Sequence, residues 1–374
     1  MHRLGQLSWG LGLVVVTSLV AGCDGSHADA AAAPEQAGTL AVTPACSSIP
    51  CLLVDASALS PGDSGFSYVN PAGLVLSGTD LFYALDVESD TGSLTGSLFR
   101  VSTTSAGSPS LIASGPSLSI AAVTPSTVFF LGPEQGSGNL FTIPPKGGTP
   151  RKFFPTSDGG TYETFLAADT QNVYFTDNEG TKAMPLAGGK AAVITGVTSY
   201  SAVTIGKNLY LADSSGDILS VAIDTIYGDA GGGPAAAVTT LTSGLMGAYN
   251  LIACGQQLCY TLEAQGYYQP NGGEALMAMS LDGTTATSLV PTANAATLSG
   301  IESLAYDGNY FYWTVGTSPA TLYKMGGQGS TPIPYVTMMT SNAGTVAFDD
   351  ECLYWSSSKG IYSVAKSAAG PFVE

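Results

Sequence analysis

The chain has 374 residues, of which 28 are acidic and 11 are basic, and its formal net charge at pH 7 is −17. This charge repels phosphate backbones and no basic stripe offsets it, so nucleic-acid binding is disfavoured. The only two histidines, His2 and His27, lie near the N-terminus. Residues 46–374 therefore contain no histidine, which excludes Ser-His-Asp and Cys-His catalysis and ordinary His-ligated metal sites there.

The first 22 residues are predicted to be a signal peptide. A weakly basic start precedes the apolar stretch Leu11–Val20, which is too short to span a bilayer comfortably. The segment ends in Leu-Val-Ala-Gly followed by Cys23 and resembles the lipobox of bacterial lipoproteins. The resemblance implies that Cys23 is lipidated, becomes the mature N-terminus and anchors the exported chain to a membrane. We expect the outer membrane or cell surface rather than the inner membrane. An ordinary secretory peptide that ends in cysteine is the alternative.

Residues 23–45 are expected to form a lipidated, flexible stalk. They are rich in Ala, Gly, Pro and small polar residues, and they lack periodic bulky apolar groups. The remaining segment, residues 46–374, is long enough to bury a large core and is expected to be one folded, monomeric domain.

A short β signature, an apolar residue followed by one or two aromatic residues, recurs seven times in this domain. The second residue of each signature is Phe82, Phe129, Tyr174, Tyr210, Cys259, Tyr312 or Tyr354. A period in the forties, with glycine-rich turns, is typical of a β-propeller with one four-stranded blade per repeat. We therefore predict an all-β propeller of four-stranded antiparallel blades, with seven blades, or six as the alternative. The aromatic residues are expected to pack between blades rather than stack on a ligand.

The third repeat shows the predicted blade most clearly. Its strands are expected at Phe165–Ala168, Asn172–Asp177, Thr181–Leu186 and Ala191–Thr195, joined by tight turns in a meander. The closing strand is left open. Leu52–Asp55 or Leu74–Ser77 is expected beside Gly360–Val364, or the tail of Phe372 and Val373 completes the last blade instead.

Residues 172–189 resemble a repeat of the YWTD type found in lipoprotein-receptor propellers. The letters YFTD stand at 174–177, and YWTV at 312–315 and YWSS at 354–357 are partial matches. The resemblance implies a propeller fold and, from its relatives, an extracellular ligand-binding role. The chain departs from the family in one respect, because YWTD propellers have six blades and seven signatures are present here.

Five cysteines follow Cys23. Cys46 and Cys51 bracket a four-residue loop, and Cys254 and Cys259 bracket another. An exported protein meets oxidising conditions, so two local disulfides are predicted, and Cys352 is left as a free thiol. No two pairs have zinc-finger spacing, and no metal site is predicted.

Catalytic residues do not stand out. The carboxylates Asp349, Asp350 and Glu351, like Asp177 and Glu179, are expected in solvated turns. The segment Asp86–Gly92 misses the spacing of an EF-hand calcium loop. No catalytic residue, metal or cofactor is therefore predicted.

Three inserts interrupt the repeat, at residues 88–95, 225–237 and 263–273. The last contains Tyr267 and Tyr268 in a Gly, Pro and Asn setting, and these two tyrosines are the candidate ligand-binding residues. They are expected either to contact a partner or to cover the edge of the core.

The sequence favours a lipid-anchored propeller that acts as a binding or scaffolding module for a protein, peptide or glycan partner at the cell envelope. Two alternatives stay open. One is a carboxylate-dependent glycosidase or lyase, and the other is a purely structural surface protein.

Overall fold

The computed structural model describes residues 46–55, 66–89, 94–104, 109–134, 137–153, 164–227, 237–245, 247–262, 275–290, 294, 297–298, 300–316, 319–338 and 343–373. The predicted signal peptide and stalk, Cys23, Tyr267 and Tyr268 lie outside these residues. No helix in the described part of the chain has the length and apolar character needed to cross a membrane.

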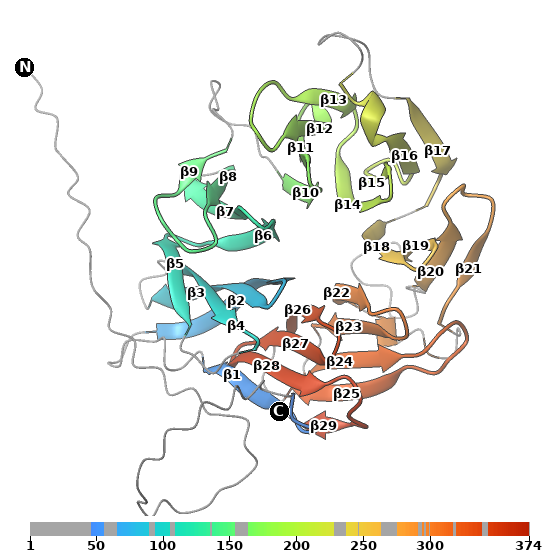
Figure 1. The fold of residues 1–374 in the computed structure, drawn as a ribbon. Coiled ribbons are helices and arrows are strands. Elements are labelled where there is room, and N and C mark those ends of the chain that lie inside the picture. The colour runs from blue at the N-terminus through green and yellow to red at the C-terminus, as the bar shows by residue number, and fades with distance from the viewer. Residues whose placement is uncertain are drawn as a thin grey trace, which may run out of the picture.

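Seven sheets, each built on four antiparallel strands, are arranged in a ring (Figure 1). The chain is therefore an all-β, seven-bladed propeller, and the six-bladed alternative is wrong. Each of blades 1 to 6 is a meander of four consecutive strands, and blade 7 combines both ends of the domain. The strands are β2 (Phe66–Ser77), β3 (Asp80–Ser89), β4 (Leu94–Ser102) and β5 (Ser110–Gly115) in blade 1; β6 (Ser119–Val123), β7 (Val128–Glu134), β8 (Ser137–Ile143) and β9 (Arg151–Lys152) in blade 2; β10 (Thr164–Ala168), β11 (Asn172–Asp177), β12 (Gly180–Pro185) and β13 (Ala192–Thr195) in blade 3; β14 (Ser199–Ile205), β15 (Asn208–Asp213), β16 (Ile218–Ala222) and β17 (Val238–Thr242) in blade 4; β18 (Ala248–Cys254), β19 (Gln257–Leu262), β20 (Ala275–Ser280) and β21 (Ala286–Ser288) in blade 5; β22 (Ile301–Tyr306), β23 (Phe311–Val315), β24 (Ala320–Met325) and β25 (Ile333–Met338) in blade 6; and β26 (Ala343–Phe348), β27 (Cys352–Ser357), β28 (Gly360–Ala365) and β1 (Cys51–Asp55) in blade 7.

The recurrent aromatic signature forms the second strand of every blade. All seven of its central residues, from Phe82 to Tyr354, are at most 2% exposed. Their side chains pack between blades, as predicted. Phe129 of blade 2 shares a cluster with Phe175 of blade 3, and Tyr174 of blade 3 shares one with Leu211 of blade 4. An aromatic side chain buries a large apolar area and fills the wedge between two twisted sheets.

The third repeat forms the predicted meander, with strand ends within about one residue of the expected ones. The turn between its second and third strands needs a glycine. Gly180 has a φ of +120°, and a Cβ atom there would lie 2.2 Å from the carbonyl oxygen of Thr195.

Both ends of the domain fasten the ring at the junction of blades 6 and 7. Strand β1 pairs antiparallel with β28, with Cys51 opposite Ser363, and completes blade 7. The expectation for Leu52–Asp55 is therefore confirmed, whereas Leu74–Ser77 belongs to the first strand of blade 1. The tail forms β29 (Phe372–Val373), which pairs parallel with β25 as a fifth strand of blade 6 and does not complete blade 7.

The disulfides differ in part from the predicted pairs. Cys254 and Cys259 are bonded as expected, but Cys46 is bonded to Cys352, 306 residues away. The predicted Cys46–Cys51 pair and the free thiol at Cys352 are therefore wrong. Ring closure is the cause, because the backbone N–H of Ala365 donates to the carbonyl of Ser47 and holds this segment against the end of β28.

The meander order defines two faces of the ring. The turn between the first and second strands and the turn between the third and fourth strands lie on one face, which we call the first-turn face. The turn between the second and third strands lies on the opposite face. Insert 263–273 follows the second strand of blade 5 and falls between residues 262 and 275, so its described flanks end on the opposite face.

Candidate functional site

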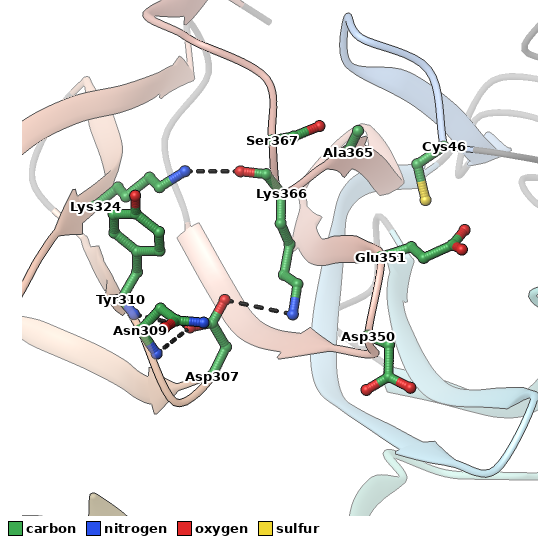
Figure 2. Close-up of a pocket in the computed structure, with 10 residues that line it drawn as sticks. All are labelled: Cys46, Asp307, Asn309, Tyr310, Lys324, Asp350, Glu351, Ala365, Lys366 and Ser367. Carbon is green, nitrogen blue, oxygen red and sulfur yellow. Dashed lines mark hydrogen bonds and ion pairs between the residues drawn. The ribbon is translucent and has the colours of Figure 1, made fainter.

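A cavity of about 500 Å³ lies on the first-turn face, between blades 6 and 7 (Figure 2). Four segments that are far apart in the sequence meet around it. They are the turn after β22, the end of β24, the turn after β26 and the end of β28. Cys46, which lies five positions before β1, adds a fifth segment. Its lining residues are Cys46, Asp307, Asn309, Tyr310, Lys324, Asp350, Glu351, Ala365, Lys366 and Ser367.

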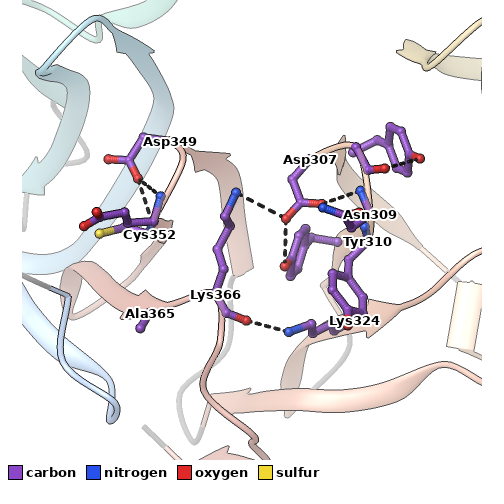
Figure 3. Close-up of polar contacts among 12 residues, drawn as sticks. Asp307, Asn309, Tyr310, Lys324, Asp349, Cys352, Ala365 and Lys366 are labelled. Carbon is purple, nitrogen blue, oxygen red and sulfur yellow. Dashed lines mark hydrogen bonds and ion pairs between the residues drawn. The ribbon is translucent and has the colours of Figure 1, made fainter.

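Asp307 fixes the turn that forms one wall of the cavity (Figure 3). Its Oδ1 accepts the backbone N–H groups of Asn309 at 2.9 Å and Tyr310 at 2.8 Å. Its Oδ2 accepts the hydroxyl of Tyr312 at 3.2 Å and forms an ion pair with Lys366 at 3.4 Å. Burial acts to raise the pKa of this carboxyl, but the two backbone donors and Lys366 outweigh burial and lower it. Asp307 is therefore an anion at neutral pH.

Lys324 places a positive charge in the same wall. Its Nζ lies 4.3 Å from the ring centroid of Tyr310 and 4.9 Å from that of Tyr335. It also donates a 2.7 Å hydrogen bond to the carbonyl oxygen of Lys366. Burial lowers the pKa of Lys324, which is only 8% exposed. Aromatic faces and a carbonyl oxygen compensate part of the lost hydration of the ammonium group.

The other wall is the turn between β26 and β27. Asp349 holds this turn, because its Oδ1 accepts the N–H groups of Glu351 and Cys352 and its Oδ2 accepts the hydroxyl of Tyr354. The side chains of Asp350 and Glu351 remain exposed and line the cavity. The three carboxylates that were expected to share one solvated turn thus divide into a structural residue and two cavity residues.

Sequence reasoning missed Lys324 and Lys366 entirely. Neither lysine is part of a motif, and they reach the cavity only because the ends of two third strands meet at neighbouring blades. The one available signal was the recurrence of an acidic turn at Asp307 and Asp349. That recurrence marks both walls but does not predict that the two turns face each other across a cavity.

The remaining candidate residues have structural roles or lie outside the described residues. Asp86 accepts hydrogen bonds from the hydroxyl of Ser117 at 2.6 Å and from the backbone of Leu118 at 2.8 Å, and thus ties down the start of blade 2. Asp177 accepts a hydrogen bond from Lys182. Within the described segments, no group of three or more His, Cys, Asp or Glu residues is arranged to hold a metal ion.

No protein-family model matches the chain, and no curated protein is similar to it in sequence. Solved structures are similar in shape. The computationally designed protein Ika8 is 11% identical, with a TM-score of 0.51 and coverage of 80% of this chain and 97% of that one. A puromycin-hydrolyzing peptidase of Mycobacterium tuberculosis is 12% identical, with a TM-score of 0.52; the match covers 77% of this chain and 48% of the peptidase. A chain of a nidogen/laminin complex is 14% identical, with a TM-score of 0.43 and coverage of 67% and 93%.

These likenesses concern the fold alone, because every identity is below 15%. The class of protein that the seven sheets define is the β-propeller, a fold that serves many unrelated functions. Any particular function must therefore be argued from the cavity and its surroundings.

Proposed function

We propose that the chain is exported, anchored to the cell envelope by a lipid on Cys23, and binds a protein, peptide or glycan partner through its first-turn face. The observation that carries the proposal is the position of the cavity. Cys46, the first described residue, lies in its wall, so the segment that leads back to Cys23 joins the propeller at the edge of the cavity.

The composition of the cavity supports a binding role. Ligand sites in proteins are concave and combine apolar or aromatic surface with a few convergent polar groups. Here the ring of Tyr310, which is 41% exposed, lies beside two lysines and three carboxylates. The lining turns are held by backbone hydrogen bonds to Asp307 and Asp349. A site that is rigid before binding loses less entropy when a partner docks.

The cavity gives less support to a glycosidase or lyase. Glycoside hydrolysis requires a carboxylic acid whose pKa is raised, so that it can protonate the leaving group. Asp307 departs from the ordinary value in the other direction, since its pKa is lowered. A purely structural protein would not need a cavity lined by charged and aromatic groups, so the cavity also favours binding over a purely structural role.

Cross-linking in intact cells tests the proposal. The tagged full chain is compared with Tyr310→Ala, which alters the cavity, and with Tyr200→Ala, which removes a tyrosine that is 50% exposed at the start of β14 on the opposite face. We expect a partner that is recovered with the wild type and with Tyr200→Ala but lost with Tyr310→Ala. Recovery unchanged in both variants would contradict binding through the first-turn face, and the absence of any specific partner would favour the structural alternative.

A further inference from the structure

The two walls of the cavity carry opposite charges (Figure 2). The first wall holds Lys324 and Asp307 of blade 6 together with the ammonium group of Lys366, which extends to Asp307 from the end of β28 in blade 7. These three groups sum to +1 from two cations and one anion. The second wall holds Asp350 and Glu351, which sum to −2. The lining as a whole is therefore −1. We call the two sides the lysine wall and the acidic wall.

The charges of the two walls do not neutralise each other directly. Among the residues that the structure describes, Lys366 forms an ion pair only with Asp307, across the junction of blades 7 and 6, and no ion pair joins its Nζ to Asp350 or Glu351, although its backbone N–H donates to the carbonyl of Glu351. The separation between Lys366 Nζ and Asp307 Oδ2 is 3.4 Å, longer than a normal charge-assisted hydrogen bond. An ammonium group has three donors, so Lys366 retains capacity for a stronger acceptor.

We propose that this cavity binds the zwitterion of an amino acid, with its carboxylate at Lys366 and its ammonium group at Asp350 and Glu351. The proposal rests on the binding role argued above and gives it a ligand class. The net charge of the lining favours a ligand with a net charge of +1, that is, a basic amino acid with a second ammonium group. The exposed ring of Tyr310 offers an apolar surface for the aliphatic stem, and about 500 Å³ accommodates a molecule of this size.

Simpler ions match the lining less well. An inorganic anion at Lys366 would lie near three carboxylates and satisfy none of them. A diamine would pair with the acidic wall and leave Lys366 with its long contact to Asp307. Only a ligand that carries both a carboxylate and an ammonium group can pair with both walls. Related compounds that lack one of these groups should therefore bind more weakly.

Calorimetric titration of the full chain at low salt with L-lysine, L-norleucine and cadaverine tests the proposal. Norleucine lacks the side-chain ammonium group, and cadaverine lacks the carboxylate. We expect L-lysine to bind about tenfold more tightly than either compound, because each lost charge-assisted hydrogen bond is worth about one factor of ten or more. Equal binding of cadaverine and L-lysine would overturn the role of Lys366, and no heat with any of the three would overturn the ligand class.

Variants locate the binding. Glu351→Gln changes an exposed side chain and should weaken L-lysine about tenfold. Lys366→Met should abolish the advantage of L-lysine over cadaverine. The matched controls are Asp224→Asn and Lys359→Met, both exposed and outside the cavity, and both should bind as the wild type does. Unchanged affinity in Glu351→Gln would overturn the proposed site.

The two proposals fail separately. If cellular cross-linking depends on Tyr310 while none of the three compounds binds, the binding face stands and the zwitterion assignment is wrong. If L-lysine binds in the cavity but cross-linking is unaffected by Tyr310→Ala, the macromolecular partner is wrong and the ligand site stands.

Discussion

In three blades, an aspartate precedes the buried tyrosine of the second strand by five residues and fastens the turn between them. One carboxylate oxygen accepts the backbone N–H groups two and three residues later, and the other accepts the tyrosine hydroxyl. The pairs are Asp169–Tyr174, Asp307–Tyr312 and Asp349–Tyr354. In blade 5 the same two positions hold Cys254 and Cys259, and the disulfide takes the place of the hydrogen bond.

Asp169 allows this fastening to be measured away from the cavity. Asp169→Ala removes the acceptor of two backbone N–H groups, at 2.7 Å each, and of the Tyr174 hydroxyl at 2.6 Å. We expect the free energy of unfolding to fall by about 1–3 kcal/mol, as for other lost hydrogen bonds to charged groups. Denaturant unfolding followed by fluorescence measures the change. The exposed Asp224→Ala is the control, and an Asp169→Ala protein as stable as this control would refute the fastening role.

The lowered pKa of Asp307 predicts the sign of a pH effect. Burial opposes this lowering, while the N–H groups of Tyr310 and Asn309 and the charge of Lys366 produce it. The Asp307 carboxylate takes up a proton less readily in the folded state than in the unfolded state, where its pKa is near 3.8. Ionised Asp307 therefore contributes its whole stabilisation at pH values above 3.8. This contribution is lost as the pH falls through the pKa of Asp307 in the folded state.

Unfolding measured against pH for the wild type and for Asp307→Asn tests this sign. The stability advantage of the wild type should be constant from neutral pH down to near the ordinary value of 3.8 and should shrink below it. Lys366, Lys324 and Tyr312 face this carboxylate; burial lowers the pKa of Lys324, and burial together with Asp307 raises the pKa of Tyr312. An advantage that grows in acid would contradict the prediction.

Local sequence patterns predicted the turns but not their partners. The letters around Asp307 and Asp349 indicate turns because an aspartate and the residues that follow it favour tight reversals. The bond from Asp307 to Tyr312 follows from the strand geometry once the turn is in place. The contact between Asp307 and Lys366 cannot be predicted in this way, because 58 residues separate the two groups in the sequence.

At the scale of whole strands, closure of the ring explains which disulfide was predictable. Cys254 and Cys259 lie on the two strands of one hairpin, where Cys254 is opposite Gln257 and Cys259 is opposite Ile252, and this closeness is visible in their spacing. The pairing of Cys46 with Cys352 depends on β1 lying beside β28, which no local pattern encodes. It is also the bond with the larger expected effect, because it constrains a loop of about 300 residues in the unfolded chain.

Two double variants compare these bonds. By the chain-entropy estimate, C46A/C352A should lower the free energy of unfolding by about 6 kcal/mol and C254A/C259A by about 2 kcal/mol. Thermal or denaturant unfolding of the oxidised proteins measures both values. The prediction depends on which variant loses more unfolding free energy. A larger loss in C254A/C259A would mean that the Cys46–Cys352 bond does not stabilise the closure of the ring.

The tail strand β29 secures the same junction from the other side. The ring of Phe372 packs edge-on against Tyr335, with centroids 5.4 Å apart, and Tyr335 is fully buried between the tail and the core of blade 6. Phe372→Ala should therefore cost about 1–3 kcal/mol, less than a fully buried phenylalanine, because Phe372 is partly exposed. Denaturant unfolding tests the value, with Val373→Ala, 70% exposed, as the control that should change little.

At the scale of the molecule, the blade number was predictable because each blade needs one large side chain in the wedge to its neighbour. Seven aromatic signatures therefore count seven blades, even where a blade lacks the YWTD-like letters. The cavity was not predictable, since it belongs to no repeat. It exists only at the junction where both ends of the domain meet and where the ring departs from its own periodicity.

The arrangement of the molecule at its membrane depends on Cys23. If Cys23 carries the lipid, the 22 residues that separate it from Cys46 allow the edge of the cavity to lie at most about 75 Å from the membrane surface. Cys23→Ala should move the chain from the membrane fraction to the soluble fraction without changing its unfolding, because the change lies outside the propeller. The C254A/C259A protein, whose changed cysteines lie in blade 5, should stay with the membrane. Continued sedimentation of Cys23→Ala with membranes would contradict lipid anchoring.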